Sequence, residues 1–157
     1  MRLCGPGAWG EPDDPKNAGR VLRRAVELGV KFIDTADAYG PEVSERGISS
    51  ALHPYPGNLV VATKGGYTRQ GPGRWRTNGS PRHLREACEG SLRRLKLDRI
   101  DLYQLHRPDS RVPFERSIEA LARLREEGKI RHVGLSNVTA EHLERAGKIV
   151  PIVSVQN

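Results

Sequence analysis

The stretch Leu59–Gly66, which reads Leu-Val-Val-Ala-Thr-Lys-Gly-Gly, decides how this chain of 157 residues is organised. Its short, β-branched apolar part predicts a buried strand, and that strand ends abruptly at Lys64 and two glycines. A lysine is almost never fully buried unless it is paired or used chemically. We therefore expect Lys64 to lie at the end of a strand and to belong to a site.

Four other apolar runs repeat this pattern of a strand that ends in polar residues. They are residues 30–33 before Asp34, 100–105 before His106, 130–135 before Ser136 and Asn137, and 151–155 before Gln156. Segments with helical periodicity separate the runs, and strict alternation of strands and helices predicts a parallel sheet. Since the carboxyl ends of parallel strands share one edge, we expect a single site there.

The number of repeats limits the size of the fold. A complete eight-fold β/α barrel usually needs about 250 residues, whereas this chain has 157. We therefore expect one domain over residues 1–157, either an open α/β sheet or a barrel that lacks its last units. Besides the five clear strands, a clipped first strand is expected near residues 1–9, and a long flexible loop over residues 65–79.

The composition excludes some classes of partner. Lys and Arg number 26 against 19 Asp and Glu, a net charge of +7. The basic residues are interspersed with acids along helical segments, and few aromatic residues accompany them, so we expect no nucleic-acid partner. No apolar run approaches the length of a membrane span, and the first residues lack the apolar core of a signal peptide. We expect no membrane association and a cytoplasmic location.

The polar residues at the strand ends suit proton transfer to a carbonyl group. Tyr39 follows Asp34 by five residues, and a tyrosine hydroxyl, with its usual pKa near 10, is a poor acid at neutral pH. A nearby ammonium such as Lys64 favours the phenolate, and Asp34 would hold that ammonium in place. His106 would donate a hydrogen bond to the substrate oxygen. None of these groups delivers a hydride, so a nicotinamide would have to supply it.

The remaining strand ends suit an amide-bearing ring such as nicotinamide, because Ser136, Asn137 and Gln156 carry hydroxyl and amide groups. Three other functions use the same residues. Lys64 could act as the nucleophile of a Schiff-base aldolase. Asp34, Asp37 and His106 could serve a metallohydrolase, although the sequence has no His-x-His pair. The chain could also be an inactive piece that only binds or assembles.

These motifs together resemble the aldo-keto reductase family. The resemblance covers essentially the whole chain in the family's order, and it lies in residues 32–40, 62–65, 102–109, 134–137 and 155–157. Residues 5–12 and 51–56 resemble, more narrowly, the bacterial pyridoxal reductase-like branch. The resemblance implies a (β/α)8 TIM barrel and the reduction of a small aldehyde or ketone with NADPH, with NADH as a possible substitute.

The same resemblance implies a role for each residue of the site. Tyr39 would be the general acid, tuned by Asp34 and Lys64, and His106 would orient the carbonyl group. Ser136 and Asn137 would hold the carboxamide of the cofactor with Gln156 nearby, and no metal is implied.

Family members are about twice as long, so the resemblance also implies a C-terminally truncated fragment. We expect about six strands of the barrel, with the last two βα units missing, and weak or no activity of the fragment alone. An unclosed barrel exposes two strand edges, through which we expect self-association to be possible.

Overall fold

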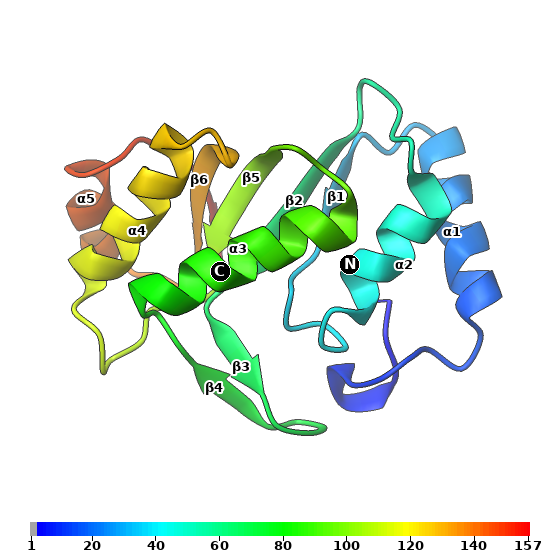
Figure 1. The fold of residues 1–157 in the computed structure, drawn as a ribbon, viewed down its shortest axis with the longest axis horizontal. Coiled ribbons are helices and arrows are strands. Elements are labelled where there is room, and N and C mark those ends of the chain that lie inside the picture. Colours follow the sequence, from blue (N-terminus) through cyan, green and yellow to red (C-terminus); the bar gives the residue numbers. More distant parts are fainter. Residues whose placement is uncertain (1–2) are drawn as a thin grey trace.

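The protein, seen in a computed structural model that describes residues 3–157, is built on one parallel sheet (Figure 1). Its strands lie in the spatial order β1 (Phe32–Asp34), β2 (Val60–Gly65), β5 (Ile100–Leu105), β6 (Ile130–Ser136) and β7 (Ile152–Gln156). Each strand pairs in parallel with the next one along this order. The five clear strands expected from the sequence are therefore confirmed, and they form a partial barrel wall.

Four helices connect these strands, a fifth precedes β1, and several begin where the sequence provides a cap. They are α1 (Pro15–Glu27), α2 (Val43–Leu52), α3 (Pro81–Leu95), α4 (Phe114–Glu126) and α5 (Ala140–Gly147). The Asp14 side chain accepts a hydrogen bond from the Asn17 backbone N–H at 2.8 Å, and Ser80 and Thr139 cap α3 and α5 in the same way. Proline at the first position of α1 and α3 fixes the helical φ there.

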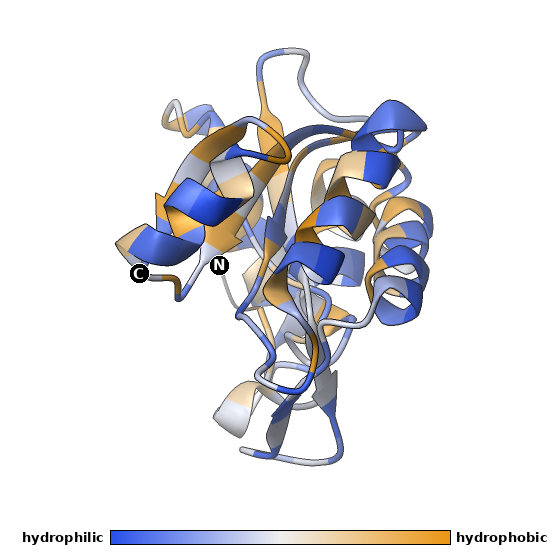
Figure 2. Cartoon of the chain, turned by 90° about the vertical axis from the view of Figure 1, so that its left-hand side faces the viewer, coloured by the Kyte–Doolittle hydropathy of each residue, from blue (hydrophilic) through white to orange (hydrophobic). Residues whose placement is uncertain are grey.

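Apolar side chains between the helices and the sheet form two clusters. One joins α3, α4 and α5 to β5 and β6 and contains Tyr103, Ile118 and Leu121; the other joins α1 and α2 to β1 and β2. Figure 2 shows apolar residues on the strands and on the helix faces turned toward them. This packing fixes the strands, and thereby the polar residues at their carboxyl ends.

The expected strand near residues 1–9 is not formed over residues 3–9. Pro6–Ala8 form a turn of 3-10 helix, and the sheet-like contact is reduced to one bridge between Trp9 and Gly40. The proline and the positive φ of 65° at Gly7 are incompatible with an extended strand. Residues 1–2 of the expected strand lie outside the described residues. Over residues 3–157 the barrel wall has five strands, where about six were expected.

The expected flexible loop over residues 65–79 is instead an antiparallel hairpin. Its strands β3 (Tyr67–Arg69) and β4 (Trp75–Thr77) project from the carboxyl edge of the sheet (Figure 1). Aromatic and β-branched residues on both sides favour this pairing, while the glycine-rich residues 70–74 form the turn. The Asn78 backbone N–H donates to the Gly66 carbonyl at 2.8 Å and closes the base of the hairpin.

Strands β1 and β7 form the two edges of the parallel sheet, each with a single neighbouring strand among the described residues. Apolar side chains are exposed on both edges: Phe32 on β1, and Val153 and Val155 on β7. These are the two open edges that the sequence led us to expect. Self-association through them stays a prediction.

A truncation in the larger cluster measures how far this packing stabilises the fold. Leu121 of α4 is fully buried, whereas Leu143 of α5 is 38% exposed. We expect Leu121→Ala to lower the free energy of unfolding by about 2–5 kcal/mol and Leu143→Ala by about 1 kcal/mol or less. Urea titrations followed by circular dichroism compare the two variants, and equal losses would contradict the assignment of the core.

Candidate active site

The buried lysine at the end of β2 forms an ion pair with Asp34 at the end of β1. Lys64 is 1% exposed, and its Nζ donates to Asp34 Oδ2 at 2.6 Å and to the Thr35 carbonyl at 2.9 Å. Burial lowers the pKa of Lys64, while the hydrogen bond and the charge of Asp34 act in the opposite direction. The Asp34 carboxylate and the Thr35 carbonyl are the acceptors that this buried ammonium requires.

Both oxygens of the Asp34 carboxylate accept hydrogen bonds from side-chain amides. Gln104 Nε2 on β5 donates to Oδ1 at 2.8 Å, and Gln156 Nε2 on β7 lies 3.4 Å from Oδ2. Gln156 was expected near a cofactor carboxamide, and in this structure its side chain reaches the ion pair. Gln104 was not singled out from the sequence, because it lies inside an apolar run.

Tyr39 and His106 lie beside the ion pair. The Lys64 Nζ is 5.5 Å from the centroid of the Tyr39 ring, and the Tyr39 and His106 rings meet edge to face with centroids 5.7 Å apart. Tyr39 comes from the loop between β1 and α2, and His106 follows β5 directly. The structure thus brings together the four residues that the sequence singled out for catalysis: Asp34, Tyr39, Lys64 and His106.

His106 is held as a neutral imidazole. It is 7% exposed, and burial together with the positive charge of Lys64 lowers its pKa to about 3. At neutral pH the ring therefore carries one N–H and one acceptor nitrogen. Its Nδ1 is buried and has no hydrogen-bond partner in the structure.

The residues expected to hold a cofactor amide lie next to this group. Asn137 adopts the left-handed conformation, with φ 56°, and its Nδ2 donates to Ser136 Oγ and to the His106 carbonyl, each at 3.0 Å. Arg107 donates to Asn137 Oδ1 at 3.3 Å. Ser136 is buried, whereas Asn137 and Gln156 are exposed at the carboxyl edge. These hydroxyl and amide groups therefore share the edge occupied by the ion pair.

The hairpin adds aromatic side chains that the sequence analysis did not assign to the site. Tyr67 meets the His106 ring at a centroid distance of 4.7 Å, and Trp75 lies 6.3 Å from the Tyr39 ring, both edge to face. The pairing of β3 with β4 is what places these two side chains beside the site, and the sequence showed no sign of that pairing. Together they form an apolar wall beside Tyr39 and His106.

Arg69 ties the hairpin to the loop that carries Tyr39. Its guanidinium donates to the carbonyls of Ala8, Ala38 and Gly7 at 2.8–3.0 Å. It also stacks on Trp75, with 3.6 Å between Cζ and the ring centroid. Because Ala38 directly precedes Tyr39, this arginine links the position of the tyrosine to that of the aromatic wall.

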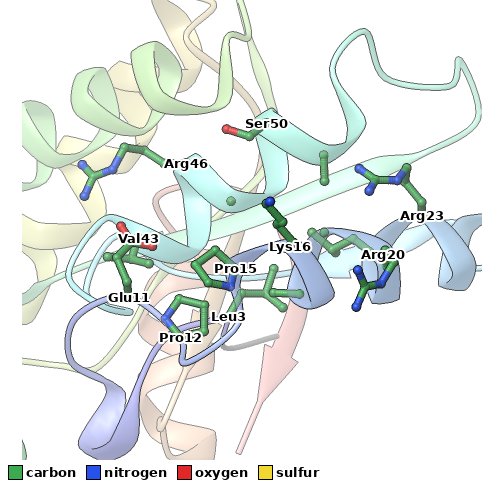
Figure 3. Close-up of a pocket in the computed structure, with 15 residues that line it drawn as sticks. Leu3, Glu11, Pro12, Pro15, Lys16, Arg20, Arg23, Val43, Arg46 and Ser50 are labelled. Carbon is green, nitrogen blue, oxygen red and sulfur yellow. The ribbon is translucent and has the colours of Figure 1, made fainter.

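A cavity of about 640 Å³ lies between α1 and α2 on the helix side of the sheet, and none of the expected site residues lines it (Figure 3). Within residues 3–157 no group of three or more His, Cys, Asp or Glu side chains is placed to hold a metal. No helix in the same range is long and apolar enough to cross a membrane.

Comparison with known proteins identifies the family. The model described as "Aldo/keto reductase family" matches residues 4–157. The chain belongs to this family. It is 49% identical over its whole length to an uncharacterized oxidoreductase of Schizosaccharomyces pombe, and 44% identical to pyridoxine 4-dehydrogenase of Escherichia coli. It covers 51% and 57% of these two proteins, so it spans about half the length of the curated relatives it matches.

Solved structures of aldo/keto reductases confirm the fold as part of a TIM barrel. The glycerol dehydrogenase of Gluconobacter oxydans is 36% identical with a TM-score of 0.86, over 94% of this chain and 46% of that one. An aldo-keto reductase from Klebsiella pneumoniae, solved in complex with NADPH, is 26% identical with a TM-score of 0.74. That match covers 96% of this chain and 49% of the other.

The neutral state of His106 predicts how stability depends on pH. Its pKa of about 3 in the folded chain lies below the ordinary value of 6.5, so the unfolded chain binds the proton more tightly. This contribution to stability is complete above pH 6.5 and is lost as the pH falls toward 3. Between pH 7 and pH 5 we expect it to decrease by about 2 kcal/mol.

Urea unfolding at both pH values, for the unmodified chain and for His106→Asn, measures this contribution. Asparagine keeps a polar side chain but does not titrate, so the variant is expected to lose less stability on acidification. The same pH dependence in both proteins would show that His106 is not held neutral in the folded state.

Proposed function

We propose that this chain carries the proton-transfer site of a reductase that converts an aldehyde or a ketone to an alcohol with NADPH. The observation that carries the proposal is the convergence of Tyr39 and His106 on the buried Lys64–Asp34 pair. Membership of the aldo/keto reductase family supports the same reaction class.

In this proposal the Tyr39 hydroxyl donates a proton to the carbonyl oxygen of the substrate. The Lys64 ammonium, 5.5 Å from the ring centroid, stabilises the phenolate that remains. Asp34 keeps Lys64 oriented through the contact of 2.6 Å between Nζ and Oδ2. The low exposure of Lys64 strengthens this electrostatic effect, because little water screens it.

His106 would orient the same carbonyl oxygen. Its neutral ring offers one N–H, which can donate to the substrate without competing with Tyr39 for the role of acid. Tyr67 and Trp75 border the ring and exclude water from that side.

The cofactor would supply the hydride when bound. The chemistry of the donor set fits its carboxamide, because an amide needs both donors and acceptors. Ser136 Oγ, the Asn137 amide and the Gln156 amide offer both at adjacent strand ends, and the latter two are exposed. We propose that these three residues hold the carboxamide, that NADPH is the cofactor and that NADH is a possible substitute.

A small carbonyl compound that carries an aromatic ring suits the wall formed by Tyr67 and Trp75. The name of the relative from Escherichia coli, pyridoxine 4-dehydrogenase, supports a substituted pyridine of that kind. Pyridoxal is therefore the first substrate to test.

One observation favours the alternative of a Schiff-base aldolase, since burial lowers the pKa of Lys64 and a neutral amine is the nucleophile of such enzymes. Two contacts argue against the aldolase, because Lys64 donates hydrogen bonds to the Asp34 carboxylate and to the Thr35 carbonyl. Both acceptors favour the charged ammonium over the neutral amine. Treatment with borohydride in the presence of an aldehyde is expected to leave Lys64 unmodified. A reduced adduct on Lys64, seen by mass spectrometry, would favour the aldolase.

Two expectations from the sequence stay predictions, namely a cytoplasmic location and self-association through the edges β1 and β7.

Besides the reductase and the aldolase, a third candidate function is a chain that binds NADPH but catalyses no reaction. Binding without reduction, in the presence of all residues of the site, would support it.

Tyr39→Phe tests the proposed acid. The test uses this chain alone and a chimera in which it replaces the matching half of pyridoxine 4-dehydrogenase. Loss of the hydroxyl is expected to lower kcat for the reduction of pyridoxal by a factor of about 100–10,000. NADPH consumption measures the rate, and fluorescence titration measures binding of the cofactor.

The matched control is Tyr55→Phe, because the Tyr55 hydroxyl donates to the Leu95 carbonyl at 2.8 Å, away from the site. This variant is expected to keep the rate of the unmodified chimera. Unchanged reduction by Tyr39→Phe would overturn the assignment of the acid.

A further inference from the structure

We propose that Gln104 is a positioning residue, which fixes the Asp34 carboxylate so that one of its oxygens stays on Lys64, and that Gly134 provides the space Gln104 needs. The catalytic meaning of this inference rests on the proposed function. The arrangement itself stands on the geometry of the sheet.

Gln104 belongs to a single row of residues across four neighbouring strands. The strand pairing aligns Lys64 with Gln104, Gln104 with Gly134, and Gly134 with Ser154. Lys64 and Gln104 are both almost completely buried. The row therefore places a neutral amide beside the ammonium, where both side chains reach the same carboxylate.

The two oxygens of Asp34 are divided between these neighbours. Oδ2 accepts from Lys64 at 2.6 Å, and Oδ1 accepts from Gln104 at 2.8 Å. A carboxylate bound only through Oδ2 is free to turn about its side chain, whereas donors on both oxygens fix its plane. Because the amide carries no charge, it adds this constraint without competing with Lys64 for the negative charge.

Gly134 is required for this arrangement, since a Cβ there would lie 2.9 Å from Gln104 Cγ and 2.4 Å from Ser154 Oγ. Real side chains do not approach so closely, so a larger residue would displace the side chains of Gln104 and Ser154. The glycine is thus explained by close packing within the row.

Several groups act on the charge of Lys64. Asp34 and Asp37 favour the ammonium, whereas burial opposes it. Lys64 in turn acts on the neighbouring His106, whose pKa its charge lowers, and lies 5.5 Å from the centroid of the Tyr39 ring. Since the hydrogen bond from Lys64 to Asp34 raises the pKa of Lys64, a change in the position of Asp34 is measurable at Lys64.

The test measures the pKa of Lys64 by NMR in this chain, with lysine labelled with ¹³C at Cε and the signal assigned by its loss in Lys64→Met. Gln104→Met keeps the volume but removes the donor to Asp34 Oδ1, so the carboxylate is held less firmly on Lys64 and the pKa of Lys64 is expected to fall by about 1 unit. Gln104→Glu keeps the shape but adds a negative charge, so the pKa is expected to rise.

Two further variants complete the experiment. Gly134→Ala is expected to lower the pKa of Lys64 as Gln104→Met does, because both displace the amide. Gln70→Met, on the exposed turn of the hairpin, is the matched control and is expected to change nothing.

Opposite shifts for Gln104→Met and Gln104→Glu support a positioning role, since a general loss of stability would not change sign with charge. An unchanged pKa of Lys64 in either folded variant, or shifts in the same direction, overturns it. The measurement needs neither NADPH nor turnover, so its failure is distinguishable from failure of the proposed reaction.

Discussion

The almost completely buried ammonium of Lys64 is the constraint on which the rest of the site depends. Moving such a charge out of water costs several kcal/mol unless acceptors surround it. Here β1 supplies those acceptors, because Asp34 ends that strand and the Thr35 carbonyl follows it. The parallel pairing of β1 with β2 is therefore also what makes the buried lysine possible. Since packing of α1 and α2 against both strands holds this pairing, the apolar core and the polar site are coupled.

The electrostatics of the site follow from this one charge. Burial, together with the charge of Lys64, lowers the pKa of His106 and keeps its imidazole neutral. Lys64 also lies beside the Tyr39 ring, where a positive charge stabilises a phenolate. In the proposed reaction these two ionisable neighbours take different roles, His106 as a neutral hydrogen-bond donor and Tyr39 as the acid. Arg69 adds a mechanical link, because it binds the Ala38 carbonyl next to Tyr39 and stacks on Trp75 of the hairpin.

Much of this could be predicted from the sequence, because it rests on local patterns. Apolar runs that end in Asp34, Lys64 or His106 predicted both the strands and the shared edge. The hairpin was missed because its strands have three residues each, too few for a periodic signal. Gln104 was missed because it is surrounded by the apolar residues of β5, and its partner comes from a strand 70 residues away. Arg69 was missed for a different reason, since it donates hydrogen bonds to backbone carbonyls, which leave no trace in a sequence pattern.

We propose that the charge on Lys64 makes Tyr39 an acid. The most direct test is the ionisation of the Tyr39 phenol in the unmodified chain and in Lys64→Met, followed by NMR of tyrosine labelled with ¹³C at Cζ. Amide spectra first establish that the variant keeps the fold. We expect Tyr39 to ionise at a lower pH in the unmodified chain than in the variant. Ionisation at the same pH in both proteins would contradict it.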